Sequence, residues 1–367
     1  MTKAAELAKM GEVLTNSQIG GRRNIVINGS QIVSQRGTSF SLSGTADTFI
    51  TDRFLISNSD TGAWTASQST DSPTGFSNSL KMDCTTADTS PTFLTLMTRF
   101  EGQDLQHLKK GTSSAEKTTL SFFVKSNKTG TYIAELRDID NNRTIGKAYT
   151  ISSADTWEQK IITFDGDTTG AFDNDNGNSL QIIWYLAVGS VYNSGTLATS
   201  WGSRVNANTA VGQVNLADST DNEWYITGIQ LEVGSQATPF EHRSFGEELA
   251  LCQRYFYIHA DGRRDMSEHI GTGTMYTSAS IFITINPKTI MRAVPSLETT
   301  TGTNFYIAFT GGAGDHFDAI TLNSARSSVN LFECEGGTNV SGTASEVVFV
   351  RLGGTSNTAK MFFDAEL

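Results

Sequence analysis

Short runs in which apolar and polar residues alternate follow one another along most of this chain, and they restrict its fold more than any other feature. Residues 120–125 read LSFFVK and residues 132–137 read YIAELR, both with a period of two. This period places alternate side chains on opposite faces of a strand. Clusters of Gly, Ser, Asn and Asp separate the runs, as turn residues do. The pattern predicts antiparallel sheets.

The runs fall into two groups, with a helical segment between them. The first predicts a jelly-roll β-sandwich over residues 24–243, and the second a smaller β domain over residues 258–367. Between them, Ser244 with Glu247 three residues later forms a capping box, which predicts an inter-domain helix over residues 244–257. No repeat of about 20 to 50 residues is visible, which argues against a β-helix or a propeller. The predicted fold is all-β, with tandem β-sandwich domains of jelly-roll type.

The N-terminal residues 1–23 predict a short helix followed by a linker. Leu7, Met10 and Leu14 lie on one stripe at spacings of three and four residues. A helix this short is marginal in water by itself, so we expect it to dock on sister chains or on a partner protein. Gly11 interrupts the stripe, and a frayed terminus is the alternative.

Charge and cysteine content exclude several functions. The formal net charge is −11, which works against binding a phosphate backbone, so no nucleic-acid partner is expected. The three cysteines, Cys84, Cys252 and Cys334, are odd in number and widely spaced, which predicts buried free thiols rather than disulfides or a zinc site. The N-terminus lacks an apolar signal region, and no apolar run is long enough to cross a bilayer. We expect a protein made in the cytoplasm, without a signal peptide or membrane insertion.

Three parts of the chain have a distinctive sequence: RRNIVINGSQIVSQRGTSF with DRFLIS, then WYITGIQLEVGSQATPFEHRSFGEELALCQRYFY, and the terminal FFDAEL. They resemble, in this order, the opening, the end of the first β domain and the C-terminal strand of tail fibres and related structural proteins of tailed bacteriophages. This resemblance implies a virion location and a homotrimer. The partners expected for the N-terminal docking helix are then other virion proteins. TWEQKIITFDG also resembles the Trp-containing strand of carbohydrate-binding jelly rolls. Neither resemblance identifies a ligand residue.

These features predict a phage virion structural protein, a trimeric tail fibre or adhesin that attaches to host cell-surface polysaccharide. A capsid head-fibre or decoration (cement) protein is one alternative, and a glycan-degrading tailspike enzyme is another. The chain contains no G-x-S-x-G elbow, P-loop or HExxH motif, and its five histidines have no ligand spacing. We therefore expect no catalytic residues and no enzyme activity.

Glycan contact is predicted from aromatic residues, because a sugar ring stacks on an exposed aromatic platform. The candidates are Tyr192, Trp201, Trp184 and Trp64. Trp184 and Tyr185 are consecutive in a strand and must face opposite sides of the sheet, so one of them belongs to the core. Tyr192 and Trp201 lie in a stretch rich in Gly, Ser and Asn, which is the preferred contact surface.

One acidic segment, residues 165–179, offers carboxylates to a structural calcium ion. The candidate ligands are Asp165, Asp167, Asp173 and Asp175. The EF-hand pattern fails here, because the glycine that the loop requires is out of place. The alternative is a long acidic turn without metal, and no other cofactor is expected.

Overall fold

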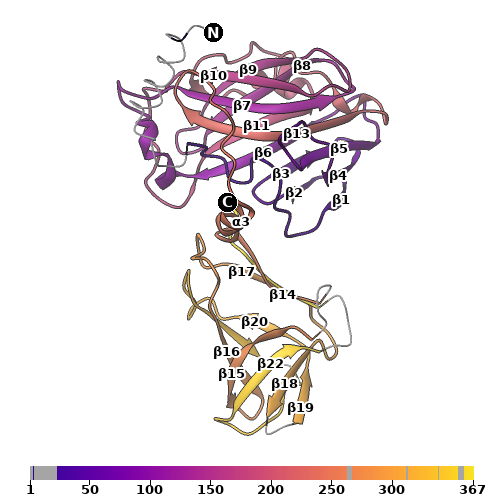
Figure 1. Ribbon diagram of the computed structural model, residues 1–367, viewed down its shortest axis with the longest axis vertical. Coiled ribbons are helices and arrows are strands. Elements are labelled where there is room, and N and C mark those ends of the chain that lie inside the picture. Colours follow the sequence, from indigo (N-terminus) through magenta and orange to yellow (C-terminus); the bar gives the residue numbers. More distant parts are fainter. Residues whose placement is uncertain (1–2, 4–22, 263–266, 311–312, 338, 354–358) are drawn as a thin grey trace. The chain divides into compact units, whose positions relative to one another are not determined.

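The computed structural model describes residue 3 and residues 23–262, 267–310, 313–337, 339–353 and 359–367. The predicted docking helix with Leu7, Met10 and Leu14 lies outside these residues. Strands dominate the described chain, which confirms the all-β prediction. The chain divides into two compact units, residues 1–245 with Leu367 (unit 1) and residues 246–366 (unit 2) (Figure 1).

Unit 1 is a sandwich of two antiparallel sheets. The six-stranded sheet has the order β1 (Ser39–Ser43), β4 (Ala63–Ser69), β5 (Ser79–Thr86), β13 (Glu223–Val233), β7 (Thr118–Ser126) and β10 (Glu158–Phe164). The seven-stranded sheet has the order β12 (Gly202–Ser203), β9 (Arg143–Ile151), β8 (Gly130–Asp138), β11 (Asn178–Val188), β6 (Phe93–Glu101), β3 (Leu55–Ser59) and β2 (Ala46–Phe49). Its short helices are η1 (Gly102–Leu108), α2 (Ser190–Asn193), η2 (Asn206–Asn208) and η3 (Leu216–Asp218).

The core of unit 1 lies between the two sheets. Along β8, Tyr132, Ala134 and Leu136 point into this core, as their alternation predicts. Trp64 and Trp184 join them and are among the largest fully buried side chains of the chain. Truncation of a buried side chain of this size costs about 3–5 kcal/mol, so these rings are major contributors to the stability of the sandwich.

The outer face of the seven-stranded sheet is partly covered by the chain itself. Residues 189–214 fold back over it, held by hydrogen bonds such as Gly146 N to Ala198 O (2.7 Å) and Val214 N to Thr131 O (2.9 Å). A second apolar cluster forms beneath this segment, with Tyr185 among its buried members. Strand β11 is consequently buried on both faces along most of its length. This segment leaves part of the outer face uncovered, and the candidate site lies there, lined by residues of β6, β11 and β8.

The segment before β1 is fastened to β13 and to the loop that follows it. Ile229 N donates to the carbonyl oxygen of Gly29 at 2.9 Å, and the side chain of Asn24 donates to the carbonyl oxygen of Ile229 at 3.0 Å. A Cβ atom on Gly29 would lie 2.0 Å from that Ile229 oxygen, so only glycine fits. The backbone N–H groups of Arg23 and Asn24 both donate to Glu241 Oε2, at 2.7 and 2.8 Å. Two segments that carry the phage resemblance therefore meet here.

Unit 2 has a sheet of seven strands and a sheet of three around one core. The larger sheet has the order β19 (Ala313–Phe317), β18 (Tyr306–Thr310), β22 (Val347–Leu352), β15 (His269–Thr277), β16 (Ser280–Ile285), β21 (Phe332–Gly336) and β20 (Ile320–Leu322). The smaller sheet has the order β14 (Phe256–Asp261), β23 (Lys360–Asp364) and β17 (Ser296–Thr299).

The predicted inter-domain helix is present and shorter than expected. Helix α3 spans Phe245–Gln253, directly after Ser244, and Glu247 lies in its first turn. Its predicted end at residue 257 is wrong, because Phe256 and Tyr257 pair with Asp364 and Phe363 in the sheet of β14 and β23. All three cysteines are buried, and the described residues contain no disulfide, as predicted. No helix of the described residues is both long and apolar enough to cross a membrane.

Candidate functional site

The predicted contact aromatics separate into two buried rings and two half-buried ones. Trp64 and Trp184 are only 1% and 0% exposed, so their assignment as glycan contacts is wrong. Both rings fill the space between the two sheets, and Trp64 Nε1 donates to the carbonyl oxygen of Thr61 at 2.7 Å. Tyr192 and Trp201 are half-buried, but they do not share one site: Tyr192 lines a cleft on the outer sheet face, and Trp201 covers a charged network.

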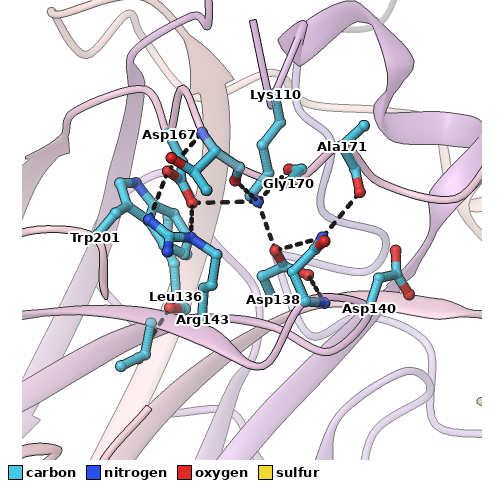
Figure 2. A network of polar contacts seen from close by, with 12 residues as sticks. Lys110, Leu136, Asp138, Asp140, Arg143, Asp167, Gly170, Ala171 and Trp201 are labelled. Atoms are coloured by element: carbon cyan, nitrogen blue, oxygen red, sulfur yellow. Dashed lines mark hydrogen bonds and ion pairs between the residues drawn. The ribbon is translucent and has the colours of Figure 1, made fainter. Parts of the chain in front are cut away.

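This charged network is centred on Lys110, whose side chain is 4% exposed (Figure 2). Its Nζ lies 2.5 Å from Asp138 Oδ2 and 3.2 Å from Asp167 Oδ2, and it donates to the carbonyl oxygens of Thr169 and Gly170 at 3.0 and 2.6 Å. The rings of Phe172 and Trp201 lie 5.1 and 5.6 Å from Nζ. Lys110 is therefore compensated on all sides and holds the acidic segment to the sheet.

Asp167, a predicted calcium ligand, is part of this network. Arg143 donates to its two carboxylate oxygens from Nε and Nη2, at 2.7 and 2.9 Å. Burial raises the pKa of Asp167, but the hydrogen bonds from Arg143, Thr169 and Lys110 outweigh it and leave the pKa below its usual value. This carboxylate already has two cationic partners.

Of the other predicted calcium ligands, Asp165 and Asp175 have partners for their carboxylates, and Asp173 is held through its backbone. Asp165 pairs with Lys117 at 2.8 Å, and Asp175 Oδ1 accepts from the backbone of Gly177 at 2.7 Å. The backbone N–H of Asp173 donates to Asp140 Oδ2 at 3.0 Å. Within the part of the chain that the structure describes, no three acidic, His or Cys side chains gather in a way that could hold a metal ion. In the structure this segment is an acidic turn fastened by Lys110 and Arg143.

The second feature is a cleft of about 230 Å³ on the outer face of the seven-stranded sheet, which we name the sheet-face cleft. Its floor is formed by outward-facing residues of β6, β11 and β8, and Tyr192 of α2 and Arg204 stand at its rim. The lining residues are Asp47, Ser57, Phe93, Thr95, Met97, Arg99, Arg137, Gln181, Ile183, Tyr185, Tyr192 and Arg204. Apolar, aromatic and cationic groups therefore meet in one concave surface.

Strand register sets a polar row across the cleft floor. Gln181 of β11 is paired with Arg99 of β6 on one side and with Arg137 of β8 on the other. Directly paired residues on neighbouring antiparallel strands have Cβ atoms about 4.5–5.5 Å apart. The amide of Gln181 is thus flanked by two guanidinium groups.

The buried side chain of Glu135 holds two residues of the cleft, Tyr185 and Arg204, in place. Its side chain is fully buried and accepts hydrogen bonds from the Tyr185 hydroxyl at 2.5 Å and from Arg204 Nε at 3.3 Å, besides one from the Thr144 hydroxyl. Burial, followed by the charge of Glu135, raises the pKa of Tyr185, so this hydroxyl remains a donor. Glu135 therefore fixes both the Tyr185 ring and the Arg204 guanidinium.

Several polar groups in the cleft have no hydrogen-bond partner in the part of the chain that the structure describes. Among the residues that the structure describes, the guanidinium of Arg137 makes no ion pair and its Nε is buried without a hydrogen bond. The Thr95 hydroxyl is likewise buried without a hydrogen bond to a described residue. The Gln181 amide makes no hydrogen bond to a described residue either. Burial, with the nearby Arg204 as the next cause, lowers the pKa of Arg137. Groups that need partners are thus directed at the cleft.

Sequence reasoning missed this cleft, although its signal was partly visible. The alternation in residues 132–137 placed Glu135 and Arg137 on the outer face of β8, which is correct. The sequence did not show that Arg99 and Gln181 would lie in the same row, because that depends on which strands pair and in which register. Charged residues at outward positions of several strands were the available signal.

No family model and no curated protein matches this sequence. Among solved structures, the chain is similar to the enzymatically active domain of tailspike protein 4 of bacteriophage CBA120, with 14% identity and a TM-score of 0.32. That match covers 57% of this chain but only 21% of the tailspike chain. The xylan-binding domain CBM22-1 of Paenibacillus barcinonensis matches with 9% identity and a TM-score of 0.27, covering 59% of this chain and 100% of that one.

A family 11 carbohydrate-binding module of Clostridium thermocellum, solved with a mixed-linked tetrasaccharide, matches with 12% identity and a TM-score of 0.26. The match covers 57% of this chain and 96% of the module. At this distance the similarities carry no argument about function. The function has to be argued from the site.

Proposed function

We propose that unit 1 is a non-enzymatic glycan-binding module whose binding site is the sheet-face cleft. The observation that carries this proposal is the combination of the Tyr192 ring at the rim with unpartnered polar groups on the floor, Arg137, Gln181 and Thr95. Sugars are bound by aromatic faces together with a few placed hydrogen-bonding groups. The cleft volume of about 230 Å³ is below the roughly 300–1,000 Å³ of pockets for drug-sized ligands, which suits one residue of a glycan rather than a long enclosed chain.

The test is a glycan microarray probed with the full chain, followed by calorimetry on the glycans that bind. Tyr192→Ala is expected to weaken binding about tenfold or more, since an aromatic platform contributes over 1 kcal/mol. Trp157→Ala is the matched control, because Trp157 is also half-buried but lies outside the cleft. Affinity unchanged by Tyr192→Ala, or lost equally in the control, would place the site elsewhere.

For the protein as a whole, we propose a trimeric tail fibre or adhesin of a phage virion. The support is the resemblance of its opening segment and of the segment from Trp224 to Tyr257 to tail-fibre proteins, together with the packing of Asn24 and Gly29 on Ile229. Antibody-gold labelling of particles is the test of location, and label on the capsid would favour the head-fibre or decoration alternative. Light scattering tests the trimer: a stable species of about 40 kDa, the mass of one chain, would contradict it.

The enzyme alternative is tested separately. Incubation of the full chain with bound polysaccharide should release no new reducing ends. Release of oligosaccharide would show a glycan-degrading tailspike instead.

A further inference from the structure

Arg137 is the least compensated cation of the sheet-face cleft. Arg204 is paired with the buried Glu135 at 3.3 Å, and Arg99 lies 4.0 Å from Asp47 and donates to the carbonyl oxygen of Leu367. The Arg137 guanidinium, half-buried between them on the outer face of β8, has no such contact to any residue that the structure describes.

This arrangement is unfavourable in the empty protein. A guanidinium stays protonated at any physiological pH, and removing it from water without a counter-charge costs free energy. Among the described residues, the charge of the buried Glu135 acts on Arg137, but this carboxylate is also engaged by Arg204, Tyr185 and Thr144. An anion delivered by a ligand would offset this cost, whereas a neutral sugar would bury the charge further.

The surroundings of Arg137 specify the kind of anion. A guanidinium presents a planar fork of N–H donors that matches a carboxylate in bidentate geometry. The amide of Gln181, paired with Arg137 across the strands, adds a further donor beside the fork. One uncompensated positive charge balances one negative charge, which favours a singly charged carboxylate over a doubly charged phosphate.

We propose that the sheet-face cleft selects an acidic sugar, and that Arg137 binds its carboxylate. This rests on the proposed glycan-binding function and names its ligand class. The protein carries a net charge of −11, so attraction of an acidic glycan to its surface as a whole is unfavourable. A preference for the acidic form must therefore come from a local site.

The experiment compares matched pairs of glycans, each a uronic- or sialic-acid oligosaccharide and its carboxyl-reduced neutral form, in calorimetry with the full chain. The acidic member is expected to bind about tenfold or more tightly, as a charge-assisted bidentate contact allows. Arg137→Met should remove this preference while leaving the weaker binding of the neutral member. Arg351→Met in unit 2 is the control and should keep the preference, because Arg351 lies outside the cleft.

The outcomes separate the two proposals. If the neutral and acidic members bind equally, or if Arg137→Met keeps the preference, the acidic-sugar proposal is wrong and the glycan-binding function stands. If neither member of any pair binds, both proposals are wrong. Intrinsic fluorescence shows whether the variant is folded, because all five tryptophans lie in unit 1.

Discussion

Lys110 and Arg137 are two cations of unit 1 with opposite surroundings, although both are linked to strand β8. Asp138, the residue after Arg137, points to the other side of the sheet and lies 2.5 Å from Lys110. Lys110 lies within reach of two carboxylates and two carbonyl oxygens (Figure 2). The rings of Phe172 and Trp201 also lie beside its ammonium group. The Arg137 guanidinium makes no ion pair or hydrogen bond to the described residues, although the charge of Glu135 acts on it. A charge that stabilises the fold is fully compensated inside the protein, and the charge of a binding site is left for the ligand.

The largest effect is expected at Lys110. Lys110→Met leaves Asp138, which is 0% exposed, without its cation, and breaking a buried ion pair from one side costs about 3–5 kcal/mol. Lys109→Met is the matched control: that neighbour pairs with Glu116 at the surface, with its side chain 54% exposed, and its loss should cost less than about 1 kcal/mol. Urea unfolding followed by tryptophan fluorescence measures both. If Lys110→Met and Lys109→Met lower the free energy of unfolding equally, Lys110 is not the structural cation that its contacts indicate.

The next effect is expected at the rim of the cleft. Tyr185→Phe removes the hydroxyl that donates to buried Glu135 at 2.5 Å, and a hydrogen bond to a charged group contributes about 1.5–3 kcal/mol. Tyr192→Phe should leave the free energy of unfolding nearly unchanged, since the Tyr192 hydroxyl has no hydrogen bond to a described residue. The same unfolding assay compares the two. A costly Tyr192→Phe would indicate that the cleft is more tightly organised than described.

Acid should weaken the Lys110 network through Asp167. The pKa of Asp167 is lower in the folded protein than in the unfolded chain, so its contribution is present at neutral pH and is lost as pH falls through its unfolded value near 4 and on to the folded one. Unfolding measured from pH 7 to pH 3 should therefore show a shallower decline in Asp167→Asn than in the native chain. Asp165→Asn is the control, because its pair with Lys117 is exposed to solvent. If the free energy of unfolding falls equally with pH in the native chain and in Asp167→Asn, Asp167 does not contribute to the acid sensitivity.

The smallest effect on stability is expected at Arg137. Arg137→Met removes an uncompensated, half-buried charge and keeps most of the side-chain volume, so unfolding should change by less than about 1 kcal/mol, in the stabilising direction. Chemical denaturation measures this beside Lys110→Met. A loss of more than 2 kcal/mol would mean that Arg137 is structural, like Lys110.

Local patterns predicted much of the fold and little of the site. The alternation of Tyr132, Ala134 and Leu136 with the residues between them identified both faces of β8, because a strand's period is a local property. Sequence could not show that residues 189–214 would cover the outer sheet face and bury Tyr185. It also could not show that Trp64 of β4 and Trp184 of β11 both point into the space between the sheets, because that depends on how the two sheets pack.

The site depends on contacts between distant residues. Lys110, just after η1, meets Asp138 and Asp167 only once the strands have paired. Nothing in the sequence around Asp167 indicates that its carboxylate pairs with Lys110. The row of Arg99, Gln181 and Arg137 likewise follows from strand order. The calcium prediction rested on the number of aspartates in residues 165–179. The cations that pair with Asp165 and Asp167 come from other parts of the chain and could not be seen from that segment.

The fastening of Arg23 and Asn24 to Glu241 has a mechanical consequence. Residues 23 and 24, where the described sandwich begins, lie beside Glu241 near its end, since the two backbone N–H groups reach one carboxylate oxygen at 2.7 and 2.8 Å. A pull between residue 23 and residue 241 is therefore resisted first by this short link, and the two sheets lie outside the load path. Tension applied between these two residues would load the link at Glu241 before it loads the strands that form the sheet-face cleft.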